Sequence, residues 1–144
     1  MAMLTRDNLK LTLEGAKAVL AAAERRAAEI GVPMDIAVVD DGGHLLAFSR
    51  MDGAKLSSVE IAMVKAHSAA IRRQPTGPYV ENGQPNLVVT LGLLVGSRAR
   101  QTPLRGGLPL LVDGKCAGAI GVSNGSEEQD LDVARAGAAA LENA

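Results

Sequence analysis

The chain has 144 residues, a formal net charge of −1 at pH 7 and a pI of about 6.1. This length predicts one domain over residues 1–144 that can bury a core without disulfides or metals. The near-neutral charge, with no basic block, argues against a nucleic-acid partner, whose binding surface needs clustered Lys and Arg. The single cysteine, Cys116, excludes an intramolecular disulfide and a cysteine-based zinc or iron–sulfur site.

The N-terminal sequence MAMLTRDNLK is charged from residue 6 and has no apolar centre, so no signal peptide is visible. The longest uncharged apolar run, Leu87 to Val95, is far shorter than the ~20 residues that cross a bilayer. We therefore expect a cytoplasmic protein with no membrane partner. Phe48 and Tyr79 are the only aromatic residues. A core without aromatic side chains buries less apolar surface per residue. Self-association would bury more of that surface, so this composition favours a homo-oligomer.

The first part of the chain predicts a helix followed by a hairpin. Apolar residues recur at three- and four-residue steps over residues 5–30, with Thr5 as a cap and a glycine at the end. Two short apolar strands, at 35–40 and 44–50, then flank Asp41-Gly42. Asp-Gly between apolar runs is a strong hairpin signal, because both turn residues must tolerate positive φ.

A second helix is expected over residues 57–73, since Ser57 and Glu60 match a capping box. It should end before a proline, because the residue preceding proline disfavours helical geometry. Residues 75–85 contain three prolines and two glycines and predict a loop. The following apolar run, Leu87 to Val95, fits either a strand or a short helix, and its periodicity does not decide between them.

The last third of the chain repeats the design of the first hairpin. A second hairpin is expected over residues 108–123, and Ser126 with Gln129 predicts a capping box for a final helix that ends near Glu142. Hairpins make antiparallel strand pairs, so the order of elements predicts an α+β fold with an antiparallel sheet and packed helices.

Three blocks of sequence, IAVVDDGGHLLAFSRMDGA, EIAMVKAHSAA and GGLPLLVDGKCAGAIGVSNGSEEQD, resemble the GlcG/HbpS family, also called the haem-degrading-domain family. The resemblance is collinear over residues 4–141 and extends to the C-terminal domain of PduO-type proteins. It implies a profilin- or PAS-like sandwich with a central antiparallel sheet of about five strands. It also implies symmetric oligomers, haem binding in some members, and a link to glycolate or diol catabolism in others.

Lys65 has the most unusual position in the predicted helices, because it lies on the apolar stripe between Ile61 and Ala69. One interpretation is a structural lysine whose ammonium reaches a carboxylate such as Asp40 or Asp130. The other is a desolvated lysine that acts as a base, a Schiff-base former or an anion-binding group.

The two histidines are candidate ligands. His67 lies on another face of the same predicted helix and could bind haem iron or transfer protons near neutral pH. His44 begins the second predicted strand and should share a face with Phe48 and Arg50. The structural alternatives are a partly exposed or hydrogen-bonded helix residue for His67 and a residue at the edge of the turn for His44. No HxxxH, HExxH or CxxC spacing is present, which argues against a multi-ligand metal site.

Arg50 and Arg105 are candidate anion-binding residues, because a guanidinium binds a carboxylate through two hydrogen bonds. A haem propionate and a small organic acid present the same group, and ordinary surface ion pairs are the alternative. Gly106 and Gly107 follow Arg105 and would let backbone amides approach a ligand or a neighbouring segment closely.

These residues support two hypotheses for a small-molecule ligand. The first is a cytoplasmic protein that binds haem or a related tetrapyrrole, with His67 or His44 as axial ligand and Arg50 or Arg105 at the propionates. The second is a cofactor-free catabolic enzyme of the isomerase, deaminase or dehalogenase type. In that enzyme Lys65 or His67 would perform acid–base chemistry on a small organic acid held by the arginines.

Overall fold

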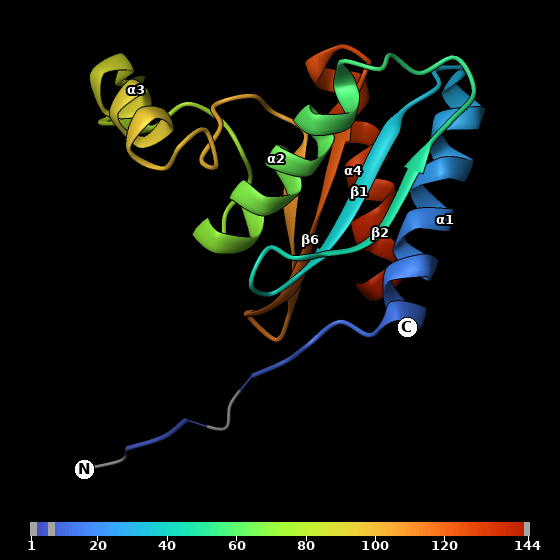
Figure 1. The fold of residues 1–144 in the computed structure, drawn as a ribbon, viewed down its shortest axis with the longest axis horizontal. Helices are drawn as coiled ribbons and strands as arrows, with labels where there is room; N and C mark the ends of the chain where they lie inside the picture. The colour runs from blue at the N-terminus through green and yellow to red at the C-terminus, as the bar shows by residue number, and fades with distance from the viewer. Residues whose placement is uncertain (1–2, 6–7, 143–144) are drawn as a thin grey trace.

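The computed structural model describes residues 3–5 and 8–142. A pair of strands separates each helix from the next along the chain (Figure 1). The elements are α1 (Leu13–Ile30), β1 (Asp35–Asp40), β2 (Leu45–Arg50), α2 (Ser58–Arg72), β3 (Val80–Glu81), β4 (Gln84–Pro85), α3 (Leu87–Gly96), β5 (Gly107–Val112), β6 (Lys115–Ser123) and α4 (Glu127–Glu142).

The main sheet has four strands in the order β2-β1-β6-β5, and all neighbours are antiparallel. The predicted α+β fold with an antiparallel sheet is therefore confirmed, with four strands where about five were expected. The run from Leu87 to Val95 adds no strand, because it forms helix α3. Strands β3 and β4 pair only with each other in a separate two-stranded sheet.

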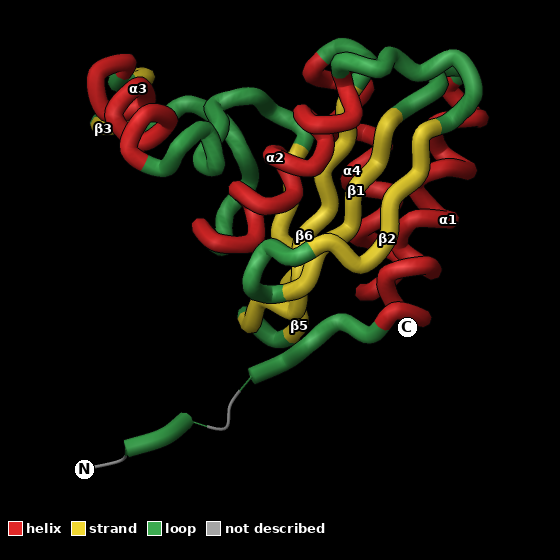
Figure 2. The backbone as a smooth tube through the Cα atoms, viewed as in Figure 1, coloured by secondary structure: helices red, strands yellow, loops and turns green. Residues whose placement is uncertain are grey.

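Helices cover both faces of the main sheet (Figure 2). On one face, α1 and α4 pack over a core of larger aliphatic side chains that includes Ile36, Val38 and Ile120. On the other face, α2 packs through alanines against Ala37, Val39 and Ala119. These side chains are small, so α2 lies close to the strands, and its backbone occupies the space that a side chain at position 121 would need.

The helix starts depend on local capping. Helix α1 begins at Leu13, where the Thr12 hydroxyl accepts a hydrogen bond from the amide of Gly15 at 2.9 Å. The expected start at Thr5 is wrong, because residues 8–12 are not helical and the amide of Leu11 donates to the carbonyl of Ala117 on β6. Residues 6 and 7 lie outside the described residues.

The two predicted capping boxes have different outcomes. At α4 both reciprocal bonds form, from the Gln129 amide to the Ser126 hydroxyl and from the Ser126 amide to the Gln129 side chain. At α2 the expected box is absent, because Ser57 already has a helical backbone and its side chain makes no capping bond.

The two hairpins differ in their turns: Asp113-Gly114 forms the predicted Asp-Gly turn, whereas in the first hairpin the positive φ lies at Gly43 and not at Asp41 or Gly42. In the β5–β6 turn, Asp113 and Gly114 have φ values of 52° and 77°. In the β1–β2 turn, Asp40 Oδ1 accepts hydrogen bonds from the amides of Gly42 and His44, each at 2.9 Å. This turn places His44 directly before β2, where it can face α2 across the sheet edge.

Candidate functional site

An open cavity of about 540 Å³ lies between the β1–β2 turn and the outer side of α2. Its walls combine apolar side chains, both histidines of the chain and two charged groups. The lining residues are Val39, Gly43, His44, Leu45, Glu60, Met63, Val64, His67 and Arg100. Cavities of this size, with apolar walls and a few convergent polar groups, are typical of sites for small molecules and cofactors.

His67 is held in this cavity by the turn opposite. Its Nδ1 lies 3.0 Å from the carbonyl oxygen of Gly43. A carbonyl only accepts, so the Nδ1–H of the ring donates this bond, and in the neutral imidazole the lone pair is on Nε2. A histidine that ligates a metal has the same arrangement, with one nitrogen bonded to a carbonyl and the other directed at the metal.

Gly43 has a specific role in this contact. Its φ is +83°, which side-chain-bearing residues rarely adopt, and a Cβ at this position would lie 2.8 Å from Cε1 of His67. The close approach of turn and ring therefore requires glycine. His44, the next residue, lines the same cavity, so the fold brings together two histidines that are 23 positions apart.

Arg100 is the basic group of the cavity. It lies in the segment between α3 and β5 and is exposed. Our sequence analysis named Arg50 and Arg105 and missed Arg100. The basic stretch SRARQTPLRGG, which contains two of these arginines, was the only available signal, and it does not indicate which arginine reaches the cavity.

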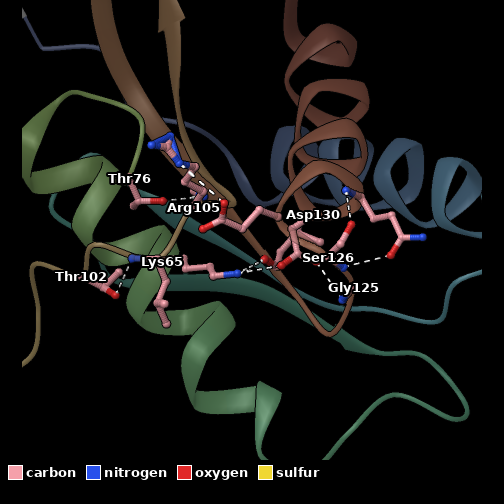
Figure 3. Close-up of polar contacts among 12 residues, drawn as sticks. Lys65, Thr76, Thr102, Arg105, Gly125, Ser126 and Asp130 are labelled. Atoms are coloured by element: carbon pink, nitrogen blue, oxygen red, sulfur yellow. Dashed lines mark hydrogen bonds and ion pairs between the residues drawn. The ribbon is translucent and has the colours of Figure 1, made fainter. Parts of the chain in front are cut away.

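Lys65 lies on the other side of α2, facing the sheet. Its ammonium donates to Asp130 Oδ2 at 2.9 Å and to the carbonyl of Val122 at 2.8 Å (Figure 3). The Lys65 and Asp130 side chains are 4% and 5% exposed, so this ion pair joins α2, β6 and α4 inside the protein. Burial raises the pKa of Asp130, and the hydrogen bond and charge of Lys65 oppose that shift. This geometry corresponds to the structural interpretation of Lys65.

Arg50 and Phe48 lie on β2 and are not among the residues that line the cavity. Phe48 packs against the alanines under α2. Arg50 pairs in register with Asp35, which is fully buried, and neither carboxylate oxygen of Asp35 has a hydrogen-bond partner among the described residues. Burial raises the pKa of Asp35, and the nearby charge of Arg50 lowers it by a smaller amount.

Arg105, Gly106 and Gly107 lie beside the buried lysine. Arg105 Nε is 3.8 Å from a carboxylate oxygen of Glu127, and the two residues form a partly exposed ion pair (Figure 3). A Cβ at Gly106 would lie 2.9 Å from Nζ of Lys65, and the amide of Gly107 donates to Thr76 Oγ1 at 2.9 Å. Both glycines therefore accommodate a neighbouring segment of the protein.

Of the eight site residues named from sequence, only His44 and His67 share the cavity. Across residues 3–5 and 8–142, no group of three or more His, Cys, Asp or Glu side chains is placed to hold a metal ion. None of the helices in the same described ranges is both long and apolar enough to cross a membrane.

The family model described as haem degrading protein HbpS-like matches residues 11–139. The chain belongs to the HbpS-like family. The GlcG protein of Escherichia coli K12 is 42% identical over 115 residues, which are 78% of this chain and 81% of GlcG. The resemblance inferred from the three sequence blocks is thus confirmed.

Two solved structures have a similar fold. The Klebsiella pneumoniae protein ORFY has a TM-score of 0.89 and 32% identity, with 100% of this chain and 99% of ORFY covered. A PduOC:heme complex has a TM-score of 0.78 and 29% identity, with 92% of this chain and 95% of PduOC covered. A haem complex is therefore known for a protein of this fold.

Proposed function

We propose that this chain binds haem, or a related tetrapyrrole, in the cavity between the β1–β2 turn and α2. The observation that carries the proposal is His67, whose Nδ1 is hydrogen-bonded to the Gly43 carbonyl and whose Nε2 has no hydrogen-bond partner among the described residues. Membership of the HbpS-like family and the PduOC:heme structure support a haem-related ligand.

The residues of the cavity fit this ligand. Val39, Leu45, Met63 and Val64 would supply apolar walls for the macrocycle, and His67 would supply a nitrogen ligand for its iron. Arg100 is the group for a propionate carboxylate. The chain has few aromatic residues, so contact with the ring plane would come from aliphatic side chains.

His44 has a second role in the proposal. It lines the same cavity and is more exposed than His67, and its backbone amide is held by Asp40. We assign the primary ligand to His67, because its ring is oriented by a hydrogen bond, whereas only the backbone of His44 is fixed in this way. Bound haem would supply redox chemistry at iron, and the protein would determine access to that iron.

The enzyme hypothesis has less geometric support. It requires an acid–base group beside an arginine that holds a carboxylate. The ammonium of Lys65 is already engaged with Asp130 and Val122 inside the protein, so it is not available to a substrate. His67 and Arg100 remain as the pair that could act on a small acid in the cavity.

A haemin titration of the purified protein tests the proposal. We expect one saturable site with a shifted Soret band, and loss of that shift in His67→Ala. Arg100→Ala should raise the dissociation constant for haemin about tenfold. This change corresponds to the loss of one charge-assisted hydrogen bond that contributes about 1.4 kcal/mol. Arg105→Ala is the matched control, because Arg105 pairs with Glu127 and should leave the affinity unchanged.

Gly43→Ala provides an independent test of the orienting bond. The added methyl group would collide with the His67 ring, so the variant should remain folded but bind haemin more weakly and with an altered Soret position. The proposal is wrong if wild-type binding is weak and unsaturable, or if His67→Ala binds as tightly as wild type.

A further inference from the structure

A second cavity, of about 340 Å³, lies at the end of α2, beside the loop through which the chain leaves α2 toward α3 (Figure 1). Its lining includes Arg72, Gln74, Pro75, Pro78, Tyr79 and Val80. It shares no lining residue with the cavity that contains His67. The two cavities are therefore separate, and the side chains of this one determine what it can bind.

Arg72 gives this cavity its charge. The residue lies in the last turn of α2, is partly buried, and has no hydrogen-bond or ion-pair partner among residues 3–5 and 8–142. Neither this cavity nor the narrow crevice beside it, which also borders Arg72 and Tyr79, has an acidic residue in its described lining. A partly buried charge is costly unless an opposite charge or hydrogen bonds compensate it. An anionic ligand would supply both to Arg72.

A second guanidinium adds to the positive potential at this loop. A Cβ at Gly77, which also lines the cavity, would lie 3.8 Å from Nη1 of Arg105. The Nε of Arg105 is 3.8 Å from a carboxylate oxygen of Glu127, which is longer than a hydrogen bond, so this charge is only partly compensated. A concave surface that carries one sign of charge attracts ligands of the opposite sign. The loop therefore favours an anion.

The remaining walls favour a ligand that also has an apolar part. Pro75, Pro78 and Val80 present aliphatic surface. Tyr79 adds an aromatic ring that is 38% exposed, and the side-chain amide of Gln74 can donate a further hydrogen bond. The volume is near the lower end of the roughly 300–1,000 Å³ that is typical of ligand pockets, so the cavity suits a small molecule.

We propose that this cavity binds a small carboxylate with an apolar body. Arg72 holds the carboxylate, because a guanidinium matches its two oxygens with two parallel N–H donors. The prolines and Tyr79 contact the apolar body, whose burial adds affinity in proportion to the apolar area removed from water. This site is additional to the proposed haem site and uses none of its residues.

The fluorescence of Tyr79 tests the site directly. The chain has one tyrosine and no tryptophan, so tyrosine emission reports on this cavity. We expect cyclohexanecarboxylate, which does not absorb where tyrosine is excited, to change the emission with a saturable, single-site curve. Cyclohexanecarboxamide has the same ring without the charge, and acetate has the charge without the ring. Each should have a dissociation constant at least tenfold higher than that of cyclohexanecarboxylate.

Arg72→Gln tests the residue that holds the carboxylate. The variant keeps a polar side chain but loses the charge and the paired donors, so the dissociation constant for cyclohexanecarboxylate should rise at least tenfold. Arg25→Gln is the matched control. Arg25 is exposed on α1 and does not line the cavity, so its variant should bind like wild type. Circular dichroism of both variants checks that they fold, and the three ligands compared on wild type decide the question without any variant.

The proposal is wrong if the emission of Tyr79 does not saturate with cyclohexanecarboxylate, or if the carboxamide binds as tightly as the carboxylate. It is also wrong if folded Arg72→Gln keeps the wild-type affinity. Inorganic phosphate that binds more tightly than cyclohexanecarboxylate would identify a site for an inorganic anion and would overturn the proposal as well. All titrations use protein without haemin, so their outcome does not depend on the proposed haem site.

Discussion

Replacing Lys65 with methionine should reveal how strongly the buried ion pair supports the fold. Methionine keeps most of the apolar stem but removes the ammonium, so Asp130 would be left in a site where its side chain is only 5% exposed. Breaking a buried pair by removing one partner costs about 3–5 kcal/mol. Asp130 keeps the hydrogen bond that it accepts from the amide of Gly125, so we expect a loss of about 3 kcal/mol, near the lower end of that range.

For a domain of this length, such a loss lowers the melting temperature by on the order of 10 °C. Guanidinium unfolding followed by circular dichroism, at one fixed protein concentration, measures the free energy of unfolding. Lys17→Met, at an exposed position on α1, is the matched control and should change it by less than about 0.5 kcal/mol. Adding Asp130→Asn to Lys65→Met removes both charges and should recover much of the loss.

The loss in Lys65→Met should also depend on pH. Burial raises the pKa of Asp130, and Lys65 supplies the interactions that oppose this shift, so the folded-state pKa rises further in the variant. A carboxyl with a folded-state pKa above its unfolded value favours folding when protonated, and this contribution disappears as pH rises through the folded-state pKa. The defect should therefore be largest at neutral pH and shrink towards pH 4. An unchanged stability at pH 7, or a defect that does not vary with pH, would refute the structural role assigned to the pair.

Two further substitutions have defined outcomes. Asp35→Asn should raise the free energy of unfolding at neutral pH by about 1 kcal/mol, because it removes a buried charge that has no hydrogen-bond partner among the described residues. Asp52→Asn, at an exposed position, is the control. Burial raises the pKa of Asp35, so the stability of the wild type falls as pH rises through that pKa. The stability gained by Asp35→Asn should therefore vanish near pH 4, and a gain that persists at pH 4 would contradict this explanation. Ser126→Ala should cost about 1 kcal/mol in thermal unfolding because the cap of α4 is lost. Ser57→Ala, which removes no capping bond, should cost less than about 0.5 kcal/mol, and equal losses would contradict the observed caps.

The hairpins were predictable because their signals are local. Asp113-Gly114 is a turn wherever apolar strands flank it, since the backbone preferences of these two residues select the turn type. The start of α1 was not predictable in the same way. Sequence analysis named Thr5 as the cap, whereas the helix is capped by Thr12, because Leu11 pairs with the distant Ala117 on β6. Helix α3 was ambiguous because a short apolar run fits a strand or a helix equally well.

The candidate site was predictable only in part. Sequence analysis identified His67 and His44 as separate candidates, but not that one cavity contains both, nor that Arg100 joins them. Sequence patterns describe neighbours a few positions apart, whereas this cavity is formed where the β1–β2 turn meets α2 and the segment after α3. For Lys65, sequence analysis named Asp40 and Asp130 as alternative partners, and only the folded structure selects Asp130, which lies 65 positions away.

Local preferences of the chain are thus sufficient for the α+β architecture, the two antiparallel hairpins and the family, because turn types and apolar periodicity depend on adjacent residues. Tertiary packing decided which charged and polar groups meet. The apolar stripe of α2 places Lys65 against the sheet and commits it to Asp130, while the opposite side of the same helix leaves His67 beside Gly43. The free energy of burying a side chain depends on all the segments that surround it, and those segments come together only in the folded protein.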